Sequence, residues 1–134
     1  MTPKSCLVKD YMARTLITFK PDTDVLDAVH TLVDKRIAGA PVVDDEGSLV
    51  GMLSEFDCMK VVLGASYHGN AGGPVRDYMT TDTKTVDAKM NIVDLAQVFV
   101  DAGFRRFPVL EDNRLVGQIS RRDVLRALQT IARN

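Results

Sequence analysis

The chain repeats itself once, and this internal repeat constrains the fold more than any other feature of the sequence. Asp10-Tyr11-Met12 returns as Asp77-Tyr78-Met79. In the same alignment, Leu49-Val50-Gly51 returns as Leu115-Val116-Gly117, and the Pro-Val pair at 41–42 returns at 108–109. Because Gly, Pro and Ser recur in the same order, chance similarity is a poor explanation, and the sequence predicts two copies of one structural unit.

Each copy carries the same succession of secondary-structure signals. In the first copy we expect a short strand over Leu16–Phe19 and a helix after Asp24, which can cap its first turn. Two strands around a turn with Gly47 follow, and a second helix begins at Ser54. The expected strands of this hairpin cover 41–43 and 49–53. The second copy has the matching elements: a helix over 91–101, strands over 108–110 and 115–119, and a helix from 120.

The expected fold is therefore of the α/β (α+β) class, with two tandem βαββα repeats over residues 1–66 and 67–134. Residues 64–74, rich in Gly and small polar residues, are expected to link them. A small three-stranded sheet covers little apolar surface by itself. We therefore expect the repeats to pack sheet to sheet about a pseudo-twofold axis, which would leave two equivalent clefts between them.

Composition excludes several classes of protein. A formal net charge of -1 provides no general attraction to nucleic acid or to an anionic membrane. No apolar run approaches the ~18 residues of a membrane span, and the start of the chain lacks a signal-peptide core. Cys6 and Cys58 show no metal-binding spacing, and no catalytic motif is present. We expect a cytoplasmic protein that is not an enzyme and that binds no metal, nucleic acid or membrane.

The repeated motifs resemble those of a cystathionine-β-synthase (CBS) domain pair, also called a Bateman module. Each copy has a hydrophobic-x-hydrophobic-Pro run, ending at Pro41 and Pro108, and a Gly-x-hydrophobic-Ser-x-x-Asp motif, ending at Asp57 and Asp123. The resemblance covers the whole chain. It implies a regulatory module without catalysis, in which two chains associate as a disc-like homodimer. It also implies that a cleft binds an adenosine-containing ligand: AMP, ADP or ATP, with NADH and S-adenosylmethionine as further candidates.

The second copy has an unusual helix start. Ser120 reads as an N-cap, yet Arg121 and Arg122 occupy the first turn, where a cation is disfavoured by about 0.3–1 kcal/mol. An anion above the helix would remove this conflict, because backbone N–H groups and arginines together bind phosphate. A carboxylate such as Asp123 can accept hydrogen bonds from both ribose hydroxyls.

The main cleft predicted from the resemblance would combine both repeats around one phosphorylated adenosine ligand. Small residues near the base would allow backbone contacts with adenine. The residues assigned to this cleft are Thr18, Ala38, Gly39, Ala40, Arg105, Arg106, Ser120, Arg121, Arg122 and Asp123. Arg105 and Arg106 could instead be a solvated strand edge or pair with Asp101 and Glu111.

The second cleft is expected to bind more weakly or to stay empty. Its predicted residues are Ser54, Asp57, Thr85 and Phe107. The first copy has no cation where the second has four arginines, and Glu55 beside Asp57 would repel phosphate. The leading interpretation is a stand-alone sensor that signals ligand occupancy to a partner protein. The alternative is a structural dimerisation module whose clefts have lost their ligand.

Overall fold

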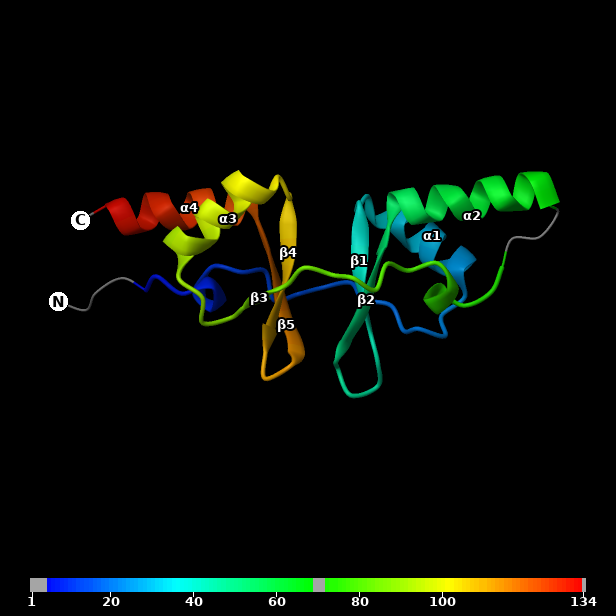
Figure 1. Cartoon of the computed structure of the whole chain (residues 1–134), viewed down its shortest axis with the longest axis horizontal. Helices are drawn as coiled ribbons and strands as arrows, with labels where there is room; N and C mark the ends of the chain where they lie inside the picture. Colours follow the sequence, from blue (N-terminus) through cyan, green and yellow to red (C-terminus); the bar gives the residue numbers. More distant parts are fainter. Residues whose placement is uncertain (1–4, 69–71, 134) are drawn as a thin grey trace. The chain divides into compact units, whose positions relative to one another are not determined.

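The computed structural model of the chain describes residues 5–68 and 72–133. Its fold is α+β. The second repeat has the expected βαββα order, and the first has the same order without its first strand (Figure 1). The first repeat contains α1 (Val25–Lys35), β1 (Gly39–Val43), β2 (Leu49–Ser54) and α2 (Glu55–His68). The second contains β3 (Val86–Asp87), α3 (Ile92–Ala102), β4 (Arg106–Glu111), β5 (Arg114–Ser120) and α4 (Arg121–Ala132). Short 3-10 turns, Val8–Asp10 and Val75–Asp77, precede each repeat's sheet.

Local signals in the sequence predicted the helix starts correctly. The Asp24 side chain accepts a hydrogen bond from the Leu26 N–H at the start of α1. Asn91 accepts one from the Val93 N–H at the start of α3. Each cap satisfies a backbone donor that would otherwise have no partner in the first turn. Both hairpins also form as expected, with β1 antiparallel to β2 and β4 antiparallel to β5.

Two expectations about the ends of elements were wrong. The strand expected over Leu16–Phe19 is reduced to a single bridge, in which Phe19 pairs with Val42 in parallel. The corresponding β3 pairs with β4 over two residues, at Val109 and Leu110. The expected linker over 64–74 is partly helical, since α2 continues to His68; residues 69–71 lie outside the described part of the chain.

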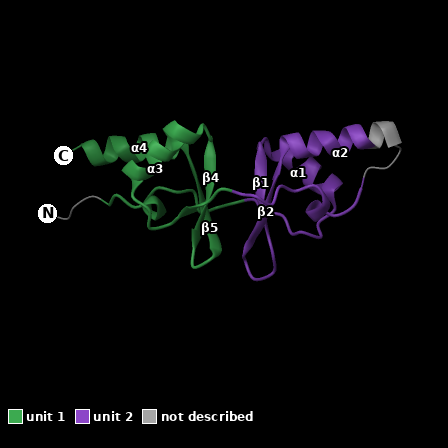
Figure 2. Cartoon of the chain, in the orientation of Figure 1, with its two compact units in different colours: residues 1–16, 84–134 green, residues 17–83 purple. Residues whose placement is uncertain are grey.

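The compact units of the structure do not coincide with the sequence repeats. Unit 1 consists of residues 1–16 and 84–134, and unit 2 of residues 17–83 (Figure 2). Each unit has its own hydrophobic core. The boundary between the sequence repeats, at residues 66 and 67, stays a prediction. The structural division shows that each repeat contributes its first segment to the core of the other repeat.

Backbone hydrogen bonds hold these exchanged segments in place. In unit 1, the Val8 and Lys9 N–H groups donate to the carbonyls of Met90 and Ala88, and Ala13 pairs with Gln118. In unit 2, the segment after the linker does the same: Val75 donates to Thr23, Arg76 to Pro21, and Met52 pairs with Thr80. These bonds provide partners for backbone polar groups that the helices and strands of each unit leave unpaired.

A methionine from each exchanged segment packs directly on a glycine of a strand. A Cβ atom added to Gly117 would lie 2.5 Å from the Met12 sulfur and 2.8 Å from the Ala13 carbonyl oxygen. A Cβ on Gly51 would lie 2.7 Å from the Met79 sulfur and 2.9 Å from the Thr80 carbonyl oxygen. Each repeated Met therefore packs against a repeated Gly, and this contact occurs once in each unit.

No helix in the two described stretches combines the length and the apolar character that crossing a membrane requires.

We predict that Gly117→Ala destabilises the protein by about 1–3 kcal/mol, because the added methyl must displace backbone as well as the Met12 side chain. Gly64→Ala is the matched control, since no atom lies within 4 Å of its added Cβ and α2 would gain helix propensity. Chemical denaturation of both variants measures the difference. Equal stabilities of the two variants would contradict the close contact.

Candidate ligand-binding site

The start of α4 is held by a reciprocal pair of hydrogen bonds between Ser120 and Asp123. The Ser120 hydroxyl accepts from the Asp123 N–H at 3.2 Å, and the Asp123 carboxylate accepts from the Ser120 N–H at 2.9 Å. The other carboxylate oxygen lies 3.1 Å from the Arg126 guanidinium. The Asp123 side chain remains 17% exposed. A charged acceptor is thus fixed at a helix amino terminus, with access to solvent.

Arg121 accounts for part of the unusual charge in this first turn. Its guanidinium donates to the Phe104 carbonyl at 2.7 Å and to the Gly103 carbonyl at 2.9 Å. Gly103 ends α3 in a left-handed conformation with φ of 72°, so these carbonyls lie at the negative end of that helix. The cation that is unfavourable at the start of α4 is therefore stabilised by the end of α3, without any ligand.

Arg122, Arg105 and Arg106 differ from Arg121, because they are exposed and form no ion pair with a described residue. The Arg105 carbonyl accepts from the Arg121 N–H at 3.1 Å, which ties the segment before β4 to the start of α4. Exposed arginines that form no ion pair within the described stretches thus flank the capped helix start. Neither Arg105 nor Arg106 forms the alternative ion pair with Asp101 or Glu111.

Unit 2 has the same kind of capped helix start, at the beginning of α2, but the charged residues around the cap differ. The Asp57 carboxylate accepts from the Ser54 N–H at 3.0 Å and from the Ser54 hydroxyl at 2.9 Å, while the Asp57 N–H donates back to that hydroxyl. Asp57 is only 5% exposed. Lys60 stands where unit 1 has Arg126, but its ammonium lies 4.8 Å from the centre of the Phe56 ring and forms no ion pair with Asp57.

Negative charges surround the start of α2 in unit 2. Burial raises the pKa of the Cys58 thiol, and the neighbouring charges of Asp57 and Glu55 raise it further. A phosphate at this helix start would meet the same two carboxylates. The electrostatic difference between the two helix starts, first inferred from the sequence, is therefore present in the geometry of the two units.

The remaining predicted residues lie in both units. In unit 2, Thr18 and Ala38 are exposed, Ala40 is buried, and Gly39 lies so close to β2 that an added Cβ would be 2.9 Å from the Leu53 carbonyl oxygen. In unit 1, Thr85 is exposed, whereas Phe107 is a core residue whose ring centre lies 5.0 Å from that of Phe99.

Within each unit, the structure brings some of the predicted residues together. In unit 1 these are Arg105, Ser120, Arg121 and Asp123. In unit 2, the Glu55 N–H donates to the Ala38 carbonyl at 2.8 Å, which places Ala38 beside the Ser54–Asp57 cap. The combination of residues from both units in one cleft stays a prediction.

Sequence reasoning missed Arg126 and Gln118. Arg126 lies one helical turn after Asp123, a spacing at which opposite charges meet, so its position could have been recognised. Its guanidinium also donates to the Tyr11 carbonyl at 3.2 Å. The Gln118 side-chain nitrogen is buried and lacks a hydrogen-bond partner among the described residues. Its only sequence signal is that the first repeat has Met52 at that position.

No group of three or more His, Cys, Asp or Glu side chains suited to a metal ion occurs in the described part of the chain.

Comparisons with known proteins bear on the fold and the family of the chain. The CBS domain family model matches residues 8–64 and 75–130. Two chloroplastic CBS domain-containing proteins of Arabidopsis thaliana, CBSX2 and CBSX1, are 31% and 32% identical to the chain over 94% and 86% of its length. An uncharacterised protein of Methanocaldococcus jannaschii, MJ1225, is 32% identical over 90% of the chain. The chain spans only 65%, 60% and 42% of the lengths of these three relatives.

Solved structures show the same fold. The crystal structure of CBSX2 in complex with AMP is 34% identical, with a TM-score of 0.79, and the match covers 96% of this chain and all of that one. The CBS domain pair of MJ0100 in complex with 5'-methylthioadenosine and S-adenosyl-L-methionine is 25% identical, with a TM-score of 0.71 over 92% of this chain and 96% of that one. Both crystallised relatives hold adenosine-containing molecules.

Adjacent arginines should differ in their effect on stability. We predict that Arg121→Ala lowers the free energy of unfolding by about 1–2 kcal/mol, because two carbonyls at the end of α3 lose their charged donor. Arg122→Ala should change it by less than about 0.5 kcal/mol, since that side chain is exposed and unpaired in the described structure. Urea denaturation of both variants tests this, and an equal loss in both would contradict the assigned role of Arg121.

Proposed function

Since this chain belongs to the CBS domain family, we propose that it is a regulatory module that binds an adenosine-containing ligand and signals its occupancy to a partner protein. The observation that carries the proposal is the start of α4, where the capped Asp123 carboxylate is flanked by the exposed Arg105, Arg106 and Arg122. The AMP complex of CBSX2 and the methylthioadenosine complex of MJ0100 support the ligand class.

Each part of the ligand has a matching chemistry in the proposed main cleft. Asp123 keeps lone pairs that can accept from the two ribose hydroxyls. The exposed side chains of Arg105, Arg106 and Arg122 would bind phosphate. Thr18 and the small residues Ala38, Gly39 and Ala40 would lie around adenine. Ser120 orients Asp123 through the cap, and Arg121 adds positive charge while it remains bound to α3.

We further propose that the two clefts differ in use. The cleft of Ser54, Asp57, Thr85 and Phe107 would be empty or would hold a less negative ligand, because Asp57 is buried, Glu55 is adjacent, and Lys60 contacts Phe56. A phosphorylated ligand would then bind once per chain. ATP, ADP and AMP share the groups on which this argument rests, and NADH carries two phosphates as well. S-adenosylmethionine is cationic and suits the second cleft better.

Signalling requires that the ligand has different affinities for two states of the protein. The partner, a disc-like homodimer, a cytoplasmic location and the lack of catalysis stay part of the proposal. The alternative function is a dimerisation and interaction module without a ligand. The nearly buried Asp57 favours this alternative for the second cleft, whereas the exposed arginines of unit 1 oppose it for the main cleft.

Isothermal titration calorimetry with AMP, ATP, NADH and S-adenosylmethionine tests the ligand class. We expect saturable binding of a phosphorylated ligand at one site per chain, with affinity reduced about 10-fold or more in Arg122→Ala and in Asp123→Asn. Arg114→Ala, an exposed arginine at the start of β5, is the matched control and should bind normally. Circular dichroism confirms that each variant is folded. No binding of any of the four ligands would favour the interaction module.

The asymmetry has its own test. Asp57→Asn should leave the affinity and stoichiometry of a nucleotide unchanged, because its cleft is not the phosphate site, while Asp123→Asn should abolish or weaken binding. Parallel titration of the two variants provides the comparison. A loss of binding in Asp57→Asn with normal binding in Asp123→Asn would reverse the assignment of the two clefts.

A further inference from the structure

Arg126 joins two parts of unit 1 that lie far apart in the sequence. One nitrogen of its guanidinium, Nη2, lies 3.1 Å from the Asp123 carboxylate and 3.2 Å from the Tyr11 carbonyl oxygen. This nitrogen carries two hydrogens, so it can donate to both acceptors at once. We call this arrangement the Arg126 bridge. It connects the candidate ligand site on α4 with the exchanged first segment, residues 5–16.

Tyr11 lies between the backbone contacts that hold this segment on unit 1. Before it, the Val8 N–H donates to the Met90 carbonyl at 2.9 Å. After it, Ala13 and Gln118 exchange two backbone hydrogen bonds, at 2.8 and 2.9 Å. The Arg126 bridge adds a contact from α4 in the middle of this stretch. Its strength therefore affects how firmly the whole segment is docked.

The bridge also orients the carboxylate that the ribose would contact. The Ser120 N–H donates to one oxygen of Asp123, and Arg126 donates to the other. A carboxylate has about four lone-pair positions, so each oxygen keeps one for a ribose hydroxyl. Because both oxygens already have a donor, the carboxylate is held in a single orientation before the ligand arrives, which lowers the cost of binding.

The charge of the ligand determines the sign of its effect on the bridge. Arg122 and Arg126 are both exposed and lie four residues apart on α4, a spacing at which like charges repel. An anion bound at Arg122 would neutralise this repulsion and so stabilise Arg126 beside it. Binding of a phosphorylated ligand and formation of the bridge therefore favour each other.

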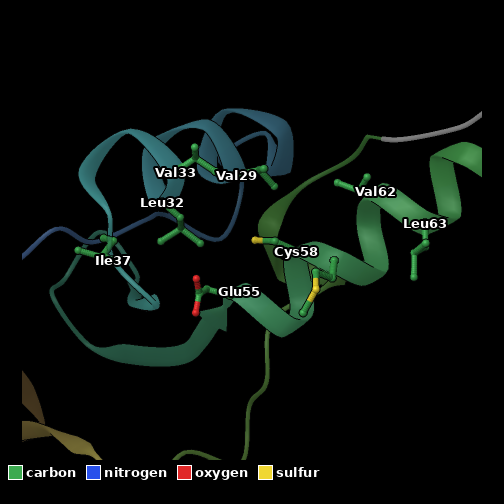
Figure 3. Close-up of a pocket in the computed structure, with 9 residues that line it drawn as sticks. Val29, Leu32, Val33, Ile37, Glu55, Cys58, Val62 and Leu63 are labelled. Atoms are coloured by element: carbon green, nitrogen blue, oxygen red, sulfur yellow. The ribbon is translucent and has the colours of Figure 1, made fainter.

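Unit 2 lacks this bridge, although it has the same cap. Lys60 stands at the position of Arg126 and Phe56 at that of Arg122, and the Lys60 ammonium lies 4.8 Å from the centre of the Phe56 ring. The pocket beside the start of α2 is lined by the Glu55 carboxylate and by apolar side chains such as Leu32, and by no cation (Figure 3). The bridge is thus a feature of the Asp123 site and not of the repeated scaffold.

We propose that Arg126 is a positioning residue that couples ligand binding at Asp123 to the docking of the first segment. The proposal rests on the proposed function and adds a route by which ligand occupancy leaves the site, since this segment continues directly into unit 2 at Ile17. The bound ligand stabilises the bridge, and the bridge holds the Tyr11 carbonyl. By linkage, a docked segment raises the affinity for the ligand by the same factor.

Hydrogen exchange of the full chain, with and without saturating ATP or AMP, tests the coupling. We expect the nucleotide to slow exchange of the Val8 and Ala13 N–H groups about 3-fold or more, because it suppresses local opening of the segment. Arg126→Ala should lose this slowing when it is saturated with the same nucleotide. The Arg126 side chain is 60% exposed, so the variant keeps its core. Lys60→Ala, at the same repeat position in unit 2, is the matched control and should keep the slowing.

A purely structural role of Arg126 gives a different result in this experiment. Arg126→Ala would then speed exchange of the segment by the same factor with and without nucleotide, and the unchanged nucleotide effect would overturn the proposal. Faster exchange of the segment in the nucleotide complex of the unchanged chain would also overturn it, because the phosphate would then withdraw Arg126 from the bridge.

Calorimetric titration of the same samples separates this inference from the proposed function. Binding of ATP or AMP to the unchanged chain without any slowing at Val8 and Ala13 would overturn the coupling and leave the ligand site intact. Binding of neither nucleotide would overturn both.

Discussion

The contact between a methionine and a glycine, made once in each unit, is the constraint on which the rest of the structure depends. Met12 lies on Gly117, and Met79 lies on Gly51, so the first segment of each repeat completes the core of the other. A methionine adapts its shape to the space above a strand, and only glycine lets the backbone approach so closely. Neither repeat buries its sheet with its own first segment. The two repeats therefore depend on each other for stability, and the helix starts are held on the resulting cores.

This shared scaffold makes the differences between equivalent positions meaningful. Both units present a Ser-x-x-Asp cap at the start of a helix, with almost the same hydrogen bonds. Around that cap, Glu55 and Phe56 stand where the other unit has Arg121 and Arg122. We therefore expect the helix start of α4 to attract phosphate and that of α2 to repel it.

Much of the fold could be predicted from the sequence because its signals are local. The caps at Asp24 and Asn91, the turn between β1 and β2 and the start of α4 depend on neighbouring residues. The exchange of first segments could not be predicted, because pairings such as Val8 with Met90 depend on contacts between distant parts of the chain. The role of Arg121 was missed for the same reason: its partners, Gly103 and Phe104, lie across the unit. A cation in the first turn of α4 is unfavourable, but the Gly103 and Phe104 carbonyls stabilise Arg121 without a ligand.

We propose that one cleft, at Asp123, binds the phosphates of an adenosine nucleotide. A crystal structure of the chain grown with ATP or AMP tests this most directly. We expect ligand density with the ribose at Asp123 and the phosphates near Arg122 and the Arg105–Arg106 pair, and no phosphate at Asp57. Phosphates bound only at Asp57 would contradict this proposal, because Asp57 is buried and Glu55 adds a second negative charge at that helix start.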